Sequence, residues 1–135
     1  MKYCLLLCGM LLSFSGFAQN TIDNVYLETS AGNPNVISKR GYATYYAKKF
    51  EGRRTTSGAK YRGKKMTAAH LSLPLGTVVT VTNLSNGKSV EVVINDRGPH
   101  SKRYMIDVSE GAAKELGFYK KGQSKVEISY EIPID

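Results

Sequence analysis

The side chains best suited to chemistry lie in the stretch INDRGPHSKRYMIDVS, residues 94–109. Asp96 ends an apolar run and opens a Gly-Pro turn, so it is either a turn former or a reactive carboxyl. A carboxyl at the point where a buried strand leaves a sheet is partly desolvated, which raises its pKa and suits a general acid. Arg97 would then donate to substrate oxygens or form a salt bridge with Asp96. Asp107 either faces a pocket or supports a loop.

The chain has two histidines, His70 and His100. His70 precedes a turn marked by Pro74 and Gly76, where a lone histidine is either packed in the fold or part of a site. Two histidines 30 positions apart, without a clear third ligand, do not make a zinc signature. The sequence also lacks a phosphate-binding or dinucleotide-binding glycine loop and a nucleophile elbow. It therefore predicts no metal and no cofactor.

The cations of the chain gather in residues 48–65, where eight Lys and Arg side chains face one acid, Glu51. Aromatic residues interleave with them: Tyr45, Tyr46, Phe50 and Tyr61. Such a segment is either a solvated loop or a surface for a sugar polymer that carries carboxylates, because sugar rings cover aromatic faces while Lys and Arg meet the acids. The formal charge of +8 also favours nucleic acid, but charge alone carries that reading, and we predict no nucleic-acid partner.

Strand patterns position these residues. The runs TVVTVTNL and SVEVVIN flank SNGK, and Asn86-Gly87 between two β-branched runs predicts a hairpin with a type I′ turn. The run KVEISYEI alternates, with Val126, Ile128, Tyr130 and Ile132 on one face. GYATYYA is also rich in strand-forming residues.

One helix is predicted after Asp107. Ser109 can cap its start, Gly117 can end it, and Ala112, Ala113 and Leu116 form its inner face. The fold class is therefore mostly β with a short helix. A closed barrel removes the exposed strand edges that such a small sheet would otherwise have.

The N-terminal residues 1–18 have the layout of a signal peptide, with Gly16 and Ala18 at the cleavage site. A transmembrane anchor would need about 20 apolar residues, and this run is shorter. Both cysteines, Cys4 and Cys8, would leave with the signal, and a lipid anchor at Cys8 is not expected because no small residue precedes it. We predict a linker or arm over residues 19–40, a domain over residues 41–132, and no integral membrane segment in the mature chain.

Three ordered blocks carry a resemblance to a known family: GYATYYAKKFEGRRTTSG, MTAAHLSLPLGTVVTVTNLSNGKSVEVVINDRGP and RYMIDVSEGAAKELG. Over residues 41–131 the chain resembles the double-psi β-barrel domain of rare lipoprotein A (RlpA), and more distantly that of expansins. The resemblance implies a six-stranded double-psi β-barrel with one or two short helices. It also implies a lytic transglycosylase that cleaves peptidoglycan between N-acetylmuramic acid and N-acetylglucosamine and leaves a 1,6-anhydro end.

The resemblance assigns roles to particular residues. The motif NDRGP implies that Asp96 is the acid and base, and TAAH implies that His70 orients Asp96 or hydrogen-bonds the sugar. One carboxyl suffices because the sugar's own hydroxyl attacks, whereas glycoside hydrolases use two. The predicted substrate-binding residues are Arg97, Tyr46, Arg54, Thr67 and Asp107.

Two departures from the family pattern keep a second reading open. Ala59 stands where family members commonly carry a glutamate, and we expect no glycan-binding repeat after the barrel. The alternative is a non-catalytic, expansin-like barrel that binds or loosens the wall. In either case we expect a monomer that binds peptidoglycan strands in the periplasm or outside the cell, associated with the wall.

Overall fold

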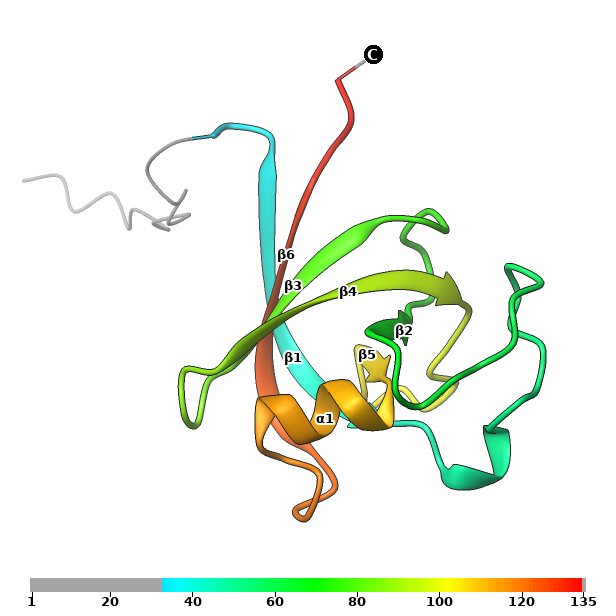
Figure 1. Ribbon diagram of the computed structural model, residues 1–135. Helices are drawn as coiled ribbons and strands as arrows, with labels where there is room; N and C mark the ends of the chain where they lie inside the picture. Colours follow the sequence, from blue (N-terminus) through cyan, green and yellow to red (C-terminus); the bar gives the residue numbers. More distant parts are fainter. Residues whose placement is uncertain (1–32, 135) are drawn as a thin grey trace, which may run out of the picture.

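The computed structural model describes residues 33–134, which form six strands, one α-helix and one short 3-10 helix (Figure 1). The elements in chain order are β1 (Val36–Tyr45), η1 (Lys48–Phe50), β2 (Thr67–Ala69), β3 (Val78–Asn83), β4 (Ser89–Asp96), β5 (Ile106–Val108), α1 (Glu110–Leu116) and β6 (Ser124–Glu131). The mostly-β fold class, with one α-helix and one further helical turn, is confirmed.

The six strands close into a barrel in the order β1-β5-β2-β4-β3-β6. The pairs β1–β5 and β2–β4 are parallel, while the other four are antiparallel. Strands distant in the sequence are therefore neighbours, and the connection between β1 and β2 lies on the same side of the barrel as β2 and β5 (Figure 1). This closed six-stranded arrangement is the predicted architecture.

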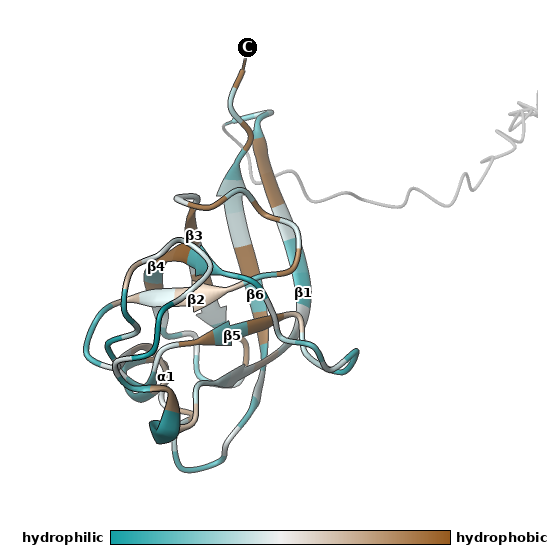
Figure 2. Ribbon diagram, turned by 90° about the vertical axis from the view of Figure 1, so that its right-hand side faces the viewer, coloured by the Kyte–Doolittle hydropathy of each residue, from teal (hydrophilic) through white to brown (hydrophobic). Residues whose placement is uncertain are grey.

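Alternation along the strands builds the core. In β6, Val126 and Ile128 are fully buried, whereas Lys125 between Ser124 and Val126 is exposed. Inward residues of β3, β4 and β5 follow the same two-residue period. Figure 2 shows the hydrophobic segments along the strands and hydrophilic colour in several loops. Ile132 does not follow the predicted pattern, because it lies beyond the end of β6 and is 47% exposed.

The predicted hairpin between β3 and β4 is present, but its turn differs from the expected one. Thr82 pairs with Ser89, and the Asn83 N–H donates to the Lys88 carbonyl, so the connection comprises residues 84–87. Gly87 has a φ of 75°. The Asn83 side chain, which is hydrogen-bonded to the Leu116 carbonyl and to the Ser124 hydroxyl, anchors this longer turn. The connection is therefore not the predicted two-residue type I′ turn.

Helix α1 begins and ends as predicted. The Ser109 hydroxyl accepts a hydrogen bond from the Ala112 N–H, and Gly117 ends the helix in the left-handed region with a φ of 80°. The predicted inner face is fully buried: Ala112, Ala113 and Leu116. The helix therefore covers one end of the barrel core.

Strand β1 already begins at Val36, within the segment that we assigned to a linker, and it pairs with β6 from Glu131 onward. The barrel thus begins before residue 41, where the predicted domain starts. The predicted signal peptide and most of the predicted arm lie outside the described residues. Between residues 33 and 134, no helix is long and apolar enough to span a membrane.

Candidate active site

Two aspartates lie on neighbouring strands of the barrel. Ala69, at the end of β2, pairs with Asp96 on β4 on one side and with Asp107 on β5 on the other. The register of β2 shifts between Ala68 and Ala69, which brings Asp96 rather than its neighbour opposite Ala69. Residues 11 positions apart in the sequence therefore share one end of the barrel.

Four donors hold the Asp96 carboxylate. The Tyr46 hydroxyl donates to Oδ2 at 2.7 Å. Oδ1 accepts from the Thr56 N–H at 2.9 Å, the Thr56 hydroxyl at 2.7 Å and the Arg97 N–H at 2.9 Å. These donors come from three separate parts of the chain, so the folded barrel fixes both the position and the orientation of this carboxyl.

The pKa of Asp96 is shifted in the direction opposite to the one predicted from the sequence. Burial alone would raise it, but the hydrogen bonds from Tyr46, Thr56 and Arg97 outweigh burial and lower the Asp96 pKa. The predicted upward shift is therefore wrong, because sequence reasoning saw the end of a buried strand and not the donors that converge on it. Asp96 is an anion at neutral pH.

Two aromatic rings pack against Tyr46, the residue whose hydroxyl donates to Asp96. The Tyr46 ring stacks on Tyr61 with centroids 4.4 Å apart and meets Phe50 edge-on at 5.9 Å. Burial, together with the hydrogen bond to Asp96 and the charge of that carboxylate, raises the pKa of Tyr46 well above its ordinary value. Tyr46 therefore remains a phenol that donates to Asp96, and in this structure its hydroxyl serves the carboxylate.

His70 lies beside Asp96 through the backbone, since its N–H donates to the Asp96 carbonyl at 3.2 Å. Its Nδ1 accepts from the N–H groups of Ser72 and Leu73, both at 3.1 Å. Burial, with the nearby charges of Lys39 and Arg97, lowers the pKa of His70. The ring is therefore neutral at pH 7, and since Nδ1 accepts two hydrogen bonds, its proton lies on Nε2.

Arg97 does not form the salt bridge with Asp96 that we considered as one of its roles. Its guanidinium donates instead to the carbonyls of His70 at 3.1 Å and Leu73 at 2.7 Å. These bonds close the turn after β2 onto the end of β4. Arg97 thus fixes the backbone that presents the His70 ring.

Asp107 differs from Asp96 in its surroundings. Its Oδ1 is buried and has no hydrogen-bond partner among the described residues. Burial, and next the negative charge of Asp96, raises the pKa of Asp107 to about 7. The carboxyl with the raised pKa is thus Asp107, and the site combines one ionised and one readily protonated carboxyl.

The loop that carries Thr56 was the main feature that sequence reasoning missed. Arg54 pairs with Lys60 in an isolated bridge, and the Arg54 guanidinium donates to the Gly58 carbonyl at 2.9 Å. Ala59 contributes its carbonyl, which accepts from Thr55. The turn formers TTSG were a signal for this loop, but nothing in the sequence indicated that it reaches Asp96.

Thr67 lies at the start of β2 and pairs with Val93, away from the end of the strand that carries Ala69 and the two aspartates. The structure thus brings Asp96, His70, Arg97, Tyr46 and Asp107 together at one end of the barrel. Arg54 joins them through the loop that holds Thr56. Within residues 33–134 no group of three or more His, Cys, Asp or Glu side chains could hold a metal ion.

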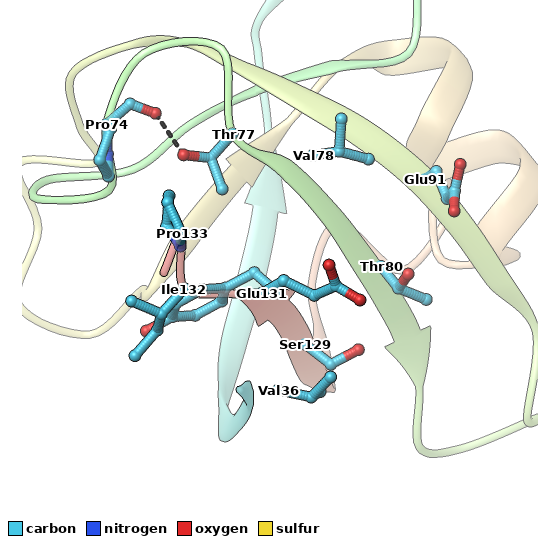
Figure 3. A pocket seen from close by; sticks show the side chains of 11 residues that line it. Val36, Pro74, Thr77, Val78, Thr80, Glu91, Ser129, Glu131, Ile132 and Pro133 are labelled. Atoms are coloured by element: carbon cyan, nitrogen blue, oxygen red, sulfur yellow. Dashed lines mark hydrogen bonds between the residues drawn. The ribbon is translucent and has the colours of Figure 1, made fainter. Parts of the chain in front are cut away.

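Two hollows lie apart from Asp96. One, of about 570 Å³, is lined by residues of β3 and β4 and by the end of β6, with Thr77 bonded to the Pro74 carbonyl at its rim (Figure 3). The other, of about 930 Å³, lies between the basic segment and helix α1 and is lined by Lys48, Arg62, Lys64, Lys65 and Lys114, among others. Neither contains Asp96 or Asp107, so the two aspartates lie outside these hollows.

The sequence of the chain is similar to that of known proteins. Residues 38–128 match a family described as lytic transglycolase. The endolytic peptidoglycan transglycosylase RlpA of Haemophilus influenzae is 46% identical over 103 residues, which are 76% of this chain and 36% of that protein. A probable endolytic peptidoglycan transglycosylase RlpA of Treponema pallidum is 50% identical over 105 residues, which are 78% of this chain and 32% of that protein. The chain spans about a third of the length of these two relatives.

Solved structures share the fold at lower identity. The Streptomyces papain inhibitor has a TM-score of 0.58 at 21% identity, over 75% of this chain and all of that one. The expansin of Clavibacter michiganensis has a TM-score of 0.58 at 20% identity, over 73% of this chain and 52% of that one. These likenesses describe the barrel alone.

Proposed function

The chain belongs to the lytic transglycolase family, and from this premise we propose that it is an exported enzyme that cleaves peptidoglycan glycan strands. The bond is the one between N-acetylmuramic acid and N-acetylglucosamine, and the product carries a 1,6-anhydro end. The observation that carries the proposal is the Asp96 carboxylate, held by four hydrogen bonds beside a second carboxyl, Asp107. A carboxylate fixed in this way is a group prepared for chemistry rather than for turn formation alone.

The protein must assist the reaction at three points. A proton must reach the leaving oxygen, positive charge at the anomeric carbon must be balanced, and the proton of the attacking C6 hydroxyl must be removed. Asp96, as an anion at neutral pH, is suited to balance the charge. We propose that His70 donates from Nε2 to a sugar oxygen, because Nδ1 is already occupied by backbone N–H groups.

Substrate binding is assigned to the surfaces on either side of Asp96. The basic segment, residues 48–65, supplies nearly all of the net charge of the chain and suits the carboxylates of peptide-bearing glycan strands. Arg54, on the same loop as Thr56, is exposed and positioned to meet such groups. We propose Arg97, Tyr46 and Asp107 as further contacts beside Asp96, with Arg97 and Tyr46 acting mainly through the groups that they hold. Thr67, two residues before Ala69 on β2, is proposed as a contact farther from Asp96.

We also propose the setting in which the enzyme acts. A leader over residues 1–18 would send the chain to the periplasm or outside the cell, where it would associate with the wall as a monomer. Detection of cleavage after Ala18 in the exported product, with the mass of a monomer in solution, is the expected result. A chain that keeps its leader or its cysteines would contradict this setting.

The test of the activity is product analysis on purified peptidoglycan. Protein exported from cells that express residues 1–135 is incubated with sacculi and with glycan strands freed of stem peptides. Mass spectrometry should detect anhydromuramyl ends with the natural chain and none above background with Asp96→Asn. Glu91→Gln, a carboxyl-to-amide change on the same strand at an exposed position, is the matched control and should release products normally.

One outcome would favour the alternative function. If the protein sediments with sacculi but releases no anhydro ends on either substrate, it is a wall-binding barrel rather than an enzyme. The position of Ala59 would then acquire importance, since this side chain can neither donate a hydrogen bond nor titrate.

A further inference from the structure

Asp107 is a second carboxyl on a strand close to the one that carries Asp96. Strand β5 places it between Ile106 and Val108, which face the core, so its side chain projects from the opposite face of the strand. On that face it lies across Ala69 from Asp96. Oδ1 is buried while the residue as a whole is only partly buried, so Oδ2 is the oxygen left to meet a substrate.

The hydrogen bonds around the two carboxyls are unequal. Oδ1 of Asp96 accepts hydrogen bonds from three donors, and Oδ2 accepts one from a fourth. A proton on Oδ1 would meet two backbone N–H groups, which can only donate, and the Thr56 hydroxyl, which would have to rotate away. Oδ1 of Asp107 accepts no hydrogen bond from the described residues, and no hydrogen bond is among the causes that shift the pKa of Asp107. The protein thus stabilises the anion at Asp96 and leaves the anion at Asp107 without support.

The charges around Asp107 act in the same direction. The titratable groups that face it are Asp96 from β4 and the phenols of Tyr46 and Tyr61 from the connection between β1 and β2. None of these groups is a cation. Burial and the Asp96 charge raise the pKa of Asp107 to about 7, so an appreciable fraction of it is protonated at neutral pH.

On the premise of the proposed function, we propose that Asp107 is the proton donor and acceptor of the reaction and that Asp96 remains ionised throughout. Asp107 gives its proton to the glycosidic oxygen as the bond from that oxygen to the anomeric carbon breaks and its electron pair moves to the leaving oxygen. Asp96 balances the positive charge that develops at the anomeric carbon.

The second half of the reaction returns the proton. The C6 hydroxyl of the muramyl residue attacks the anomeric carbon, and its proton passes to the Asp107 carboxylate. This carboxylate is a good base because Asp96 repels its charge and no described donor stabilises it. No water is consumed, and the enzyme ends in the protonation state in which it began.

A spectroscopic experiment tests the assignment without relying on turnover. In protein labelled with ¹³C at the aspartate carboxyls, the Asp107 signal, identified by its loss in Asp107→Asn, should titrate near pH 7. The Asp96 signal, identified with Asp96→Asn, should titrate below the ordinary aspartate value of 3.8. The opposite assignment, with Asp96 protonated and Asp107 ionised at pH 6, would overturn the proposal.

A kinetic experiment separates proton donation from charge stabilisation. Removing a general acid costs about 10²–10⁴-fold in rate, but a nitrophenyl glycoside of N-acetylmuramic acid has a leaving group that departs without a proton. The factor by which Asp107→Asn lowers the rate should therefore be at least about ten times smaller on this substrate than on glycan strands. Asp96→Asn should lose activity equally on both.

The outcomes distinguish two kinds of failure. If the natural chain releases no anhydro products from either substrate, the proposed function fails, while the titration still reports on the two carboxyls. If the natural chain is active and Asp107→Asn is as active as Glu91→Gln on glycan strands, the role of Asp107 is refuted. An Asp107→Asn protein that does not fold leaves the labelled natural chain to decide, since its two perturbed signals are assigned by Asp96→Asn alone.

Discussion

Replacing Asp107 with Asn should stabilise the fold at pH 8 and change it little near pH 4. Between pH 4 and pH 7 the folded protein holds a proton on Asp107 that the unfolded chain has released, so the free energy of unfolding falls as the pH rises through this range. The rise in the pKa of Asp107 from an ordinary value of 3.8 to about 7 corresponds to roughly 4 kcal/mol at 1.36 kcal/mol for each factor of ten. Since the side chain keeps some exposure to solvent, we expect about 2–3 kcal/mol.

Urea unfolding at pH 4.5, 6 and 8 measures this effect. His70, whose pKa is lowered, acts in the opposite direction, because its contribution to stability is lost as the pH falls below about 6.5. The variant is therefore compared with the natural chain at each pH, which cancels the His70 contribution. Glu91→Gln, a carboxyl-to-amide change at an exposed position, is the matched control. A difference for Asp107→Asn that is independent of pH, or that turns destabilising at pH 8, would refute the buried-carboxyl reasoning.

Three further changes test other parts of the structure. Tyr46→Phe removes one charge-assisted hydrogen bond from Asp96, worth about 1.5 kcal/mol at this partly exposed site, and should lower the rate of anhydro-product release about tenfold, whereas Tyr45→Phe, which removes a bond to the Tyr119 carbonyl instead, should not. Asn83→Ala removes buried bonds to the Leu116 carbonyl and Ser124 and should lower the free energy of unfolding by about 2–4 kcal/mol, measured in urea. Replacing both lysines at positions 64 and 65 with Gln should weaken sedimentation with sacculi and reduce its salt dependence more than the same change at positions 120 and 121.

Local patterns predicted the elements of this fold well. Ser109 and Gly117 marked both ends of α1, and the alternation around Val126 and Ile128 marked β6, because capping and strand periodicity depend on neighbouring residues only. The turn between β3 and β4 was less predictable. Its length depends on Asn83, whose partners Leu116 and Ser124 lie far away in the sequence.

The site shows the same division. The sequence identified both aspartates and His70 as candidates, since few other side chains in the chain could do chemistry. It could not predict which aspartate is protonated, because the donors to Asp96 come from Tyr46 and Thr56, 50 and 40 positions away. The pairing of Ala69 with both aspartates is a property of the barrel topology, in which β2 lies between β4 and β5.

This arrangement bears on the alanine at position 59. Its loop holds Asp96 through Thr56, and Ala59 contributes to that loop with its backbone carbonyl, which accepts from the N–H and the hydroxyl of Thr55. A glutamate side chain at this exposed position is therefore not required to orient Asp96. Since Asp96 can supply the negative charge and Asp107 the proton, the proposed reaction has both groups that it uses without a third carboxyl. The loss of the glutamate would then affect how glycan strands bind rather than whether the bond can be broken, and a raised KM with an unchanged kcat relative to Ala59→Glu is the kinetic pattern that this reasoning requires.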